Sequence, residues 1–421
     1  MANDEELQRI ARLQSVLSSP VLADEMKSRF DVVDSLDRCF AHRNVSDCVT
    51  HVLLARDTAS GRLCVLKIFA LDSVEKHYIN ELLKTDSAAN NNFATQYACC
   101  IELSVLRVAR QLLIDRATPC FPFLRSEFIV DVLDDDAHHI WPYFERCRQS
   151  HWASVPRLIL CMDFLSRTTL RRWLTHHIVD SRHFHHHLDR QQDAVDVTKF
   201  LQSQLTTLFL HIFCALYCLQ RADDILHNDL HLDNILMVSS SLSSDDAAQF
   251  AYVVENHHCV VRNDLGESLR QLPVICDFGM ASSVSTESSQ RVVLSDYYCD
   301  TQRCAYHNGA RRRDSKCYQT AMCDVTRLLN DVFDHLYQCG AAYGAARMAI
   351  VMRAFASFDD LRLQLNLRRQ TQCVRHDSLA RLLLNTFAFN AAPITACQVS
   401  DICVYDCDAA TDRYRQRVQR Q

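Results

Sequence analysis

The chain has 421 residues, of which 48% are hydrophobic, and carries a formal net charge of −6. This apolar content suffices for a large core and argues against extended disorder, and the length fits a large two-lobed domain. The absence of a strong positive charge disfavours nucleic acid or an anionic membrane as the main partner.

Cysteine is unusually frequent, with 21 residues and no CxxC pair anywhere in the sequence. The odd count and the missing spacing argue against a disulfide framework and against a zinc ribbon. The start, "MANDEELQRIARLQ", holds no apolar run that could act as a signal peptide. These features predict an intracellular protein of the cytoplasm or nucleus that uses cysteine as a small buried side chain.

The first third of the chain is predicted to be rich in strands. Residues 4–19 form an amphipathic helix pattern that ends at Pro20, within an extension covering 1–29. Two β-rich apolar runs at 49–57 and 62–70 flank a turn that ends in Gly61, which predicts a hairpin. Further along, a helix is predicted at 100–114, and strands are predicted at 127–134 and 157–165.

From about residue 198 the pattern is mostly helical, with short apolar strands at 234–238, 251–255 and 272–278. The apolar run 205–219 is too short to span a membrane comfortably and contains His211, so a buried core helix is expected. Polar, serine-rich stretches at 239–249 and 282–290 predict exposed loops. The order of elements predicts an α+β fold with a small β-rich lobe at 30–165, a larger helical lobe at 166–400 and a polar tail at 401–421.

Three local motifs carry residues suited to chemistry. "HNDLHLDNIL" at 227–236 places Asp229 and Asn234 five residues apart, and "VICDFGMA" places Asp277 directly after an apolar strand. Far upstream, "CVLKIF" embeds Lys67 in a strand, where an ammonium group is costly unless it is paired.

These three motifs, in this order, resemble those of the eukaryotic protein kinase superfamily over roughly residues 30 to 340. The resemblance implies a two-lobed kinase-like fold that uses ATP and Mg²⁺. It also implies transfer of the γ-phosphate to a hydroxyl of a protein substrate, with serine or threonine favoured over tyrosine.

The resemblance assigns a role to each motif residue. Lys67 would pair with the α- and β-phosphates, while Asp277 and Asn234 would each bind a Mg²⁺ ion. Asp229 would accept or orient the proton of the attacking hydroxyl. His227 is expected to pack beneath the loop as a scaffold rather than take part in chemistry.

The resemblance also places the adenine site. Met162 would be the gatekeeper, and Asp163 to Leu165 would form the hinge that offers backbone donors and acceptors to the base. Val52 and Leu236 would supply apolar walls.

Two further contacts are implied. Glu102, at the start of "ELSVLRVARQL", is preferred over Glu81 as the carboxylate that steadies Lys67. Asp324, in "CDVTRLL", would anchor the backbone of the catalytic loop, and Arg327 could face the same network.

The sequence departs from the kinase pattern at the phosphate-binding loop. No glycine precedes Gly61, and Val45, Asp47 and Thr50 stand where the glycine-rich loop would be. Glycine lets backbone N–H groups approach phosphate closely, so this departure puts tight nucleotide binding in question.

The catalytic loop departs as well. Asn228 replaces the usual arginine. His231 replaces the lysine of serine/threonine kinases; it could still contact the γ-phosphate, and its charge is expected to vary with pH near neutrality. No Ala-Pro-Glu motif follows the DFG, and residues 251–279 indicate an extra hairpin before Asp277. This arrangement is most similar to protein kinases of large DNA viruses, which would place the protein in a host cell or a virion.

Two other functions stay open. A pseudokinase that serves as a binding scaffold would explain the missing glycines, and a small-molecule phosphotransferase is compatible with "DLHLDN". The histidine-rich stretch 176–187 is interpreted as an exposed insertion rather than a dedicated metal site. The basic run 310–314 is either a solvated turn or a docking patch for an acidic or phosphorylated group.

Overall fold

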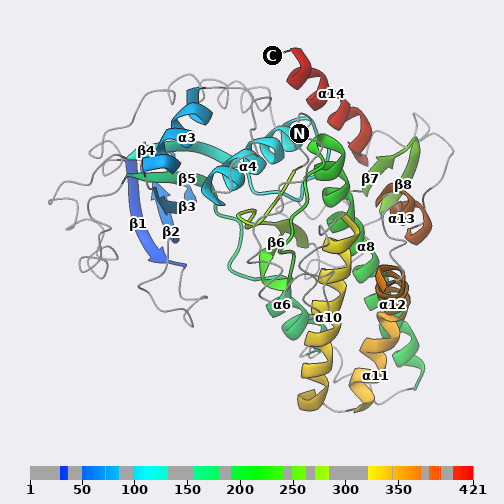
Figure 1. The fold of residues 1–421 in the computed structure, drawn as a ribbon. Coiled ribbons are helices and arrows are strands. Elements are labelled where there is room, and N and C mark those ends of the chain that lie inside the picture. The colour runs from blue at the N-terminus through cyan, green and yellow to red at the C-terminus, as the bar shows by residue number, and fades with distance from the viewer. Residues whose placement is uncertain are drawn as a thin grey trace. The chain divides into compact units, whose positions relative to one another are not determined.

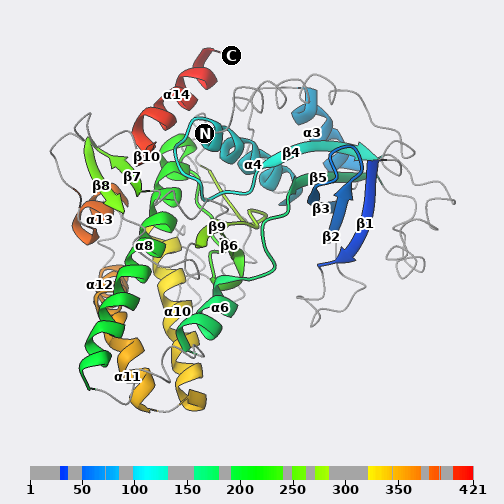
Figure 2. The same cartoon turned by 180° about the vertical axis from the view of Figure 1, so that it is seen from behind.

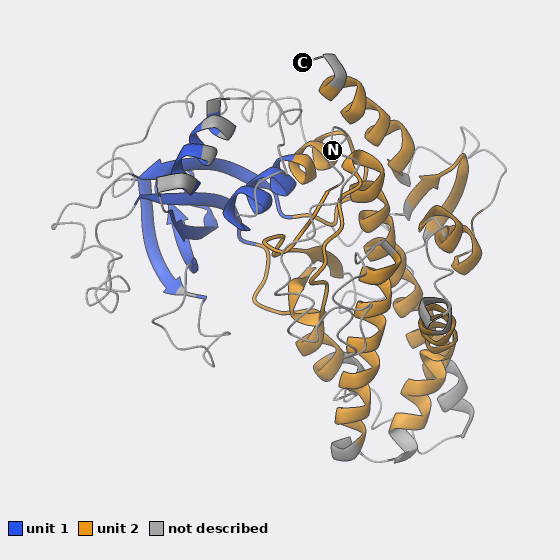
Figure 3. Cartoon of the chain, viewed as in Figure 1, with its two compact units in different colours: residues 1–107, 122–164 blue, residues 108–121, 165–421 orange. Residues whose placement is uncertain are grey.

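A computed structural model of the chain describes residues 29–36, 50–71, 73–84, 98–130, 156–179, 191–239, 249–261, 271–283, 321–343, 345–370, 379–387, 389 and 402–420. The chain divides into two compact units (Figure 3). Unit 1 comprises residues 1–107 and 122–164, and unit 2 comprises residues 108–121 and 165–421.

Unit 1 is built on a five-stranded antiparallel sheet with the order β1-β2-β3-β5-β4 (Figure 1). The fourth strand begins three residues before the predicted start at 127. The strands are β1 (Phe30–Ser35), β2 (Thr50–Asp57), β3 (Leu63–Ala70), β4 (Leu124–Val130) and β5 (Arg157–Asp163).

The predicted hairpin between β2 and β3 is confirmed. Gly61 has φ +67°, a left-handed conformation that glycine adopts without a steric penalty. The turn is closed by the Gly61 N–H, which donates to the Asp57 carbonyl over 2.7 Å, and by the Asp57 N–H, which donates to the Arg62 carbonyl over 2.9 Å.

The two faces of β3 explain why a lysine can stand in an apolar strand. Cys64, Leu66 and Ile68 are fully buried in a core that includes Phe30 and Ile159. Because side chains alternate along a strand, Lys67 points to the opposite face. After β3 come α3 (Ser73–Lys84) and α4 (Ala98–Ile114), and α4 confirms the predicted helix at 100–114.

Unit 2 is largely helical, and two of its helices, α8 and α10, are long and pack together (Figures 1 and 2). Its helices include α6 (Leu170–Trp173), the π-helix η6 (Leu174–Val179), α8 (Gln191–Asp223), the short 3₁₀ helix η7 (Leu232–Asn234), α10 (Ala321–Tyr343), α11 (Ala345–Ala354), α12 (Ala356–Gln370), α13 (Leu379–Thr386) and α14 (Cys407–Arg420).

The apolar helix α8 forms the centre of unit 2. Its segment Val197–Asp223 has the length and composition of a membrane span, but 78% of its most apolar stretch is buried by the rest of the chain. Helices α10, α11, α13 and α14 all pack against it. The prediction of a buried core helix is therefore confirmed, although the helix is longer than the predicted apolar run.

Two small sheets complete unit 2. Strands β6 (Ile235–Ser239) and β9 (Gln271–Ile275) pair antiparallel. The hairpin β7 (Gln249–Val254) and β8 (His257–Val261) lies between them in sequence, as predicted. It joins a separate three-stranded sheet, in which β10 (Ile402–Asp406) runs parallel to β7.

The expected polar tail at 401–421 is instead part of the fold of unit 2. Strand β10 extends the sheet, and α14 packs on α8 and β7. Cys407, Ala410 and Tyr414 are buried along one side of α14, because their spacing places them on one helical face. The arginines and aspartates between them made this segment look uniformly polar in sequence.

Residues 108–121 were expected in the first lobe but belong to unit 2. The Ile275 N–H donates to the Cys120 carbonyl over 2.9 Å, and the Cys407 thiol lies 3.4 Å from the Ala117 carbonyl. The rings of Phe121 and Phe278 meet edge to face. These contacts come from elements more than 150 residues away, which a pass along the chain does not reveal.

The mixed α+β expectation is confirmed at the level of an N-terminal five-stranded antiparallel sheet followed by a largely helical region. The described cysteines are free thiols and most are buried, as expected. The predicted helix at 4–19, most of the histidine-rich stretch 176–187, most of the loop 239–249 and the basic run 310–314 lie outside the described residues.

Candidate functional site

The loop that joins α8 to β6 carries three of the predicted functional residues, Asp229, His231 and Asn234. It begins at Leu226, whose backbone N–H and carbonyl both bond to Ser282, over 2.8 and 2.9 Å. It ends in the turn η7, which leads directly into β6. The loop is therefore held at both ends by secondary structure.

Asp324, in the first turn of α10, anchors the middle of this loop. Its two carboxylate oxygens accept hydrogen bonds from the backbone N–H groups of His227 and Asn228, each over 2.8 Å. The carboxylate is buried, with only 3% of the residue exposed. The predicted anchoring contact is thus present, and it supports the unusual positive φ of Asn228 (+60°).

His227 packs beneath the loop and is fully buried. Its Nδ1 atom accepts a hydrogen bond from the Asp229 N–H over 3.3 Å, so Nε2 carries the proton and donates to the Cys276 carbonyl over 3.0 Å. The ring also packs against Phe278, with centroids 5.2 Å apart. These contacts agree with the predicted scaffold role and tie the loop to the segment around Asp277.

Asn234 and Asp277, the predicted metal ligands, are brought close by the backbone. The Cys276 N–H, directly before Asp277, donates to the Asn234 carbonyl over 2.9 Å. The Asn234 amide nitrogen in turn donates to the Asp229 carbonyl over 2.9 Å. Asp277 has φ +64°, a strained value that recurs at functional positions. Among the described residues, no group of three or more His, Cys, Asp or Glu side chains could hold a metal ion.

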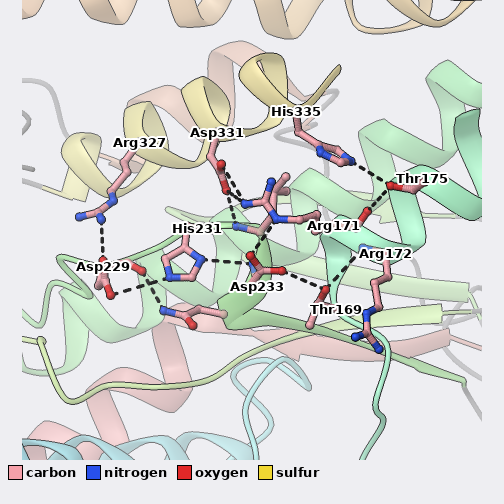
Figure 4. Close-up of polar contacts among 12 residues, drawn as sticks. Thr169, Arg171, Arg172, Thr175, Asp229, His231, Asp233, Arg327, Asp331 and His335 are labelled. Atoms are coloured by element: carbon pink, nitrogen blue, oxygen red, sulfur yellow. Dashed lines mark hydrogen bonds and ion pairs between the residues drawn. The ribbon is translucent and has the colours of Figure 1, made fainter. Parts of the chain in front are cut away.

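Asp229 lies between two basic side chains (Figure 4). Its Oδ1 atom accepts a hydrogen bond from Arg327 Nη2 over 2.5 Å, and its Oδ2 atom lies 3.8 Å from His231 Nε2. The second guanidinium nitrogen, Arg327 Nη1, donates to the Asn228 carbonyl over 2.6 Å. The expectation that Arg327 faces the network of Asp324 is therefore confirmed.

His231 differs from expectation in its charge. Its Nδ1 atom accepts from the Asp233 N–H over 3.3 Å, which leaves Nε2 as the proton-bearing atom that faces Asp229. Burial lowers the pKa of His231 below its ordinary value, and the nearby carboxylates of Asp229 and Asp331 oppose this shift only in part. The sequence predicted that His231 changes charge near neutral pH, whereas its burial moves this change to a more acidic pH.

A group of charged residues next to the loop was not predicted from the sequence (Figure 4). Arg171, in α6, bonds to Asp233 over 2.7 Å and to both carboxylate oxygens of Asp331 over 3.0 and 3.1 Å. Asp331 also accepts the Leu232 N–H over 2.8 Å. These contacts hold the turn η7 between α6 and α10.

A signal for this group does exist in the sequence. Asp324, Arg327, Asp331 and His335 are spaced by three, four and four residues, which places them on one face of α10. The polar face of an amphipathic helix usually meets solvent, but Asp324 and Arg327 were already expected at the loop, so the other polar residues on their face are expected near it as well. Asp324 and Arg327 were predicted from the sequence, whereas Asp331 and His335, which continue the same period, were not.

In unit 1, Lys67 forms an ion pair with Glu102. The ammonium nitrogen lies 2.5 and 2.6 Å from the two carboxylate oxygens, and 11% and 3% of the two side chains are exposed. Glu102 is therefore a partner of Lys67, as preferred from the sequence, whereas the side chain of Glu81 lies outside the described residues. Val52 stands opposite Lys67 on the neighbouring strand β2.

The Lys67–Glu102 pair predicts a measurable effect on stability. We expect Glu102→Gln to lower the free energy of unfolding by about 2–3 kcal/mol, because the partly buried ammonium group would lose the negative charge of Glu102. Replacing both residues with apolar ones (K67M/E102L) should recover most of this loss. Urea denaturation followed by circular dichroism would measure both, with the exposed Arg56→Gln as control. A loss below about 0.5 kcal/mol for Glu102→Gln would contradict the prediction.

The residues predicted to hold adenine fall in both units. In unit 1, Met162 is nearly buried at the end of β5, and Asp163 is paired with Arg125. The Asp163 N–H donates to the Phe123 carbonyl over 3.1 Å, so this predicted backbone donor is already engaged within unit 1. In unit 2, Leu165 is half-buried and Leu236 forms an isolated bridge with Thr169.

The prediction of an exposed loop at 282–290 is wrong for its first two residues. Ser282 and Ser283 are buried, and the Ser283 hydroxyl donates to the Asp223 carbonyl over 2.5 Å. The amide of Asn228 donates to Ser282 Oγ and to the Met280 carbonyl. Residues 284–290 lie outside the described residues.

No protein-family model matches the chain, and no curated protein is significantly similar to it in sequence.

Proposed function

We propose that the chain has a divergent kinase-like fold and transfers the γ-phosphate of ATP to a hydroxyl of a protein substrate, with serine or threonine favoured over tyrosine. The observation that carries this proposal is the assembly of Asp229, Asn234 and Asp277 around one loop. Asp324 and His227 hold that loop through hydrogen bonds that are buried or partly buried. The motif order in the sequence supports the same conclusion.

Asp229 is the residue proposed to receive the substrate hydroxyl. Phosphoryl transfer needs alignment and charge neutralisation more than covalent help from the protein. A carboxylate whose orientation is held by Arg327 is suited to accept the hydrogen bond of the incoming hydroxyl. Its partial exposure, at 21% of the side chain, leaves it accessible to a substrate.

Asn234 and Asp277 fit a Mg²⁺ ion that is bound together with phosphate. Mg²⁺ prefers oxygen ligands and is commonly held by one or two carboxylates, substrate phosphates and water. An amide oxygen and a carboxylate, joined through the Cys276–Asn234 hydrogen bond, match that need without a cluster of three acidic residues. The ion would neutralise the charge of the phosphates.

Lys67 is proposed to bind the α- and β-phosphates of ATP. Its pairing with Glu102 supports this role, because the carboxylate compensates a buried ammonium and fixes its position before a ligand arrives. Val52 and Met162 are the proposed apolar contacts of the adenine on unit 1.

A second candidate is a scaffold that binds partners without phosphate transfer. One observation favours it: no glycine precedes Gly61, so the usual glycine-rich cover for the phosphates is missing. The four polar residues Lys67, Asp229, Asn234 and Asp277 favour the enzyme, because a scaffold would not require all of them.

Thermal melting with and without Mg-ATP tests the proposal. We expect Mg-ATP at about 100 times Kd to stabilise the wild-type chain by about 2.7 kcal/mol, and Asp277→Asn to lose the magnesium-dependent shift. Asp334→Asn, at an exposed position of α10, serves as the matched control that keeps it.

A transfer assay with labelled ATP separates the remaining functions. Phosphate on serine or threonine of a protein, absent in the Asp229→Ala variant, supports the protein kinase. Labelled small molecules alone would favour a small-molecule phosphotransferase. A folded wild-type chain with no melting shift at millimolar Mg-ATP would count against the enzyme and for the scaffold.

A further inference from the structure

The carboxylate of Asp229 is contacted from two sides by basic groups on different elements (Figure 4). Arg327 reaches Oδ1 from α10, and His231 faces Oδ2 from the same loop as Asp229. The two oxygens of Asp229 therefore have different partners. Oδ1 accepts a short hydrogen bond from Arg327, whereas Oδ2 lies 3.8 Å from Nε2 of His231.

The two basic groups differ in charge at neutral pH. A guanidinium group stays protonated throughout the physiological range. His231 is mostly neutral there, because burial lowers its pKa. Arg327 therefore places a permanent positive charge next to Asp229, whereas the neighbouring His231 ring is uncharged.

We propose that Arg327 is a positioning residue for Asp229, supplying from α10 the fixed positive charge that holds Oδ1 so that Oδ2 is presented to the substrate hydroxyl. The inference rests on the proposed function. During transfer the hydroxyl oxygen bonds to the γ-phosphorus, the bond from that phosphorus to ADP breaks, and the hydroxyl proton passes to Oδ2 and then to solvent. Arg327 does not touch the reacting atoms and acts through the orientation of the carboxylate.

A purely structural role is the rival explanation. Arg327 also donates to the Asn228 carbonyl over 2.6 Å, where the backbone has a positive φ. An arginine that served only to hold this backbone would be needed whatever group stood at position 231. The positioning role instead requires that only one cation contacts the Asp229 carboxylate, so that the second carboxylate oxygen can accept the substrate hydroxyl.

The decisive experiment exchanges the cation between the two positions. Arg327→Gln should lower kcat at least about tenfold, with KM for ATP changed less than about twofold. His231→Lys should also lower kcat, because two cations would then occupy both oxygens of Asp229. In the double variant R327Q/H231K, the lysine at position 231 is the one cation that contacts the Asp229 carboxylate. Its kcat should therefore be several-fold higher than that of Arg327→Gln.

The rival explanation predicts the opposite result for the double variant. If Arg327 only holds the backbone, the two losses multiply and R327Q/H231K is slower than either single variant. That outcome would overturn the inference, as would an unchanged kcat in Arg327→Gln. The melting shift with Mg-ATP, measured for every variant, shows that the fold and nucleotide binding are retained. Arg353→Gln, an exposed arginine of α11, is the matched control.

The outcomes separate this inference from the proposed function. A wild-type chain that transfers no phosphate overturns both. An active wild type in which Arg327→Gln is equally active overturns the positioning role of Arg327 and leaves the proposed function standing.

Discussion

Replacing Asp229 with asparagine is expected to lower the rate of phosphate transfer by about 10²- to 10⁴-fold, which is the usual contribution of a positioned acid or base. The amide has nearly the same shape, but it cannot accept the proton of the substrate hydroxyl. It also offers Arg327 a neutral partner in place of a carboxylate, which weakens the bond that orients the side chain. Labelled-ATP transfer under saturating Mg-ATP is the measurement.

Asp233 is a matched control for this variant. It lies four residues further along the same loop and is also paired with an arginine, Arg171, but its side chain is 42% exposed. Asp233→Asn should therefore change the transfer rate less than about tenfold, because exposed ion pairs contribute little. Comparable losses in both variants, or an active Asp229→Asn, would show that the loop does not use Asp229 as proposed.

Replacing Asp324 with alanine is expected to lower the free energy of unfolding by about 3–6 kcal/mol. The buried carboxylate accepts two backbone hydrogen bonds, from His227 and Asn228. Hydrogen bonds to a charged group are worth about 1.5–3 kcal/mol each, and both are lost here, one from a buried N–H group and one from a partly buried N–H group. Urea denaturation followed by circular dichroism measures the loss.

A second readout keeps this prediction testable if the alanine variant fails to fold. Asp324→Asn retains one acceptor oxygen, so it should lose less stability, while amide hydrogen exchange at 226–234 should accelerate. The exposed Asp334→Asn on the same helix should stay within about 0.5 kcal/mol of the wild type. If Asp324→Ala were as stable as this control, the loop would not depend on the anchor.

The sequence alone determined the features that depend on neighbouring residues. Lys67 stood out because it interrupts an apolar, strand-like run, and the turn before β3 was readable because the stretch 58–61 ends in Gly61. The helix α4 followed from its apolar period. The motif residues Asp229, Asn234 and Asp277 were visible because their spacing along the chain is itself the signal.

The tertiary structure decided which distant residues meet. Arg171 and Asp331 are 160 positions apart, and Arg417 reaches Asp115 across 302 positions. Local periodicity shows that a face is polar or apolar, but it does not show which other element covers that face. For this reason the segment 401–421 looked like a polar tail, and the partners of α10 beyond Arg327 were missed.

Burial decided the chemistry of single groups in the same way. The charge of His231 depends on how much water its ring loses, and the accessibility of Ser282 and Ser283 depends on their contacts with the loop and with Asp223. Desolvation is a property of the whole packed unit rather than of a residue type. The sequence therefore identified the candidate residues, and only their packing determined how Arg327, His231 and Asp229 share charge.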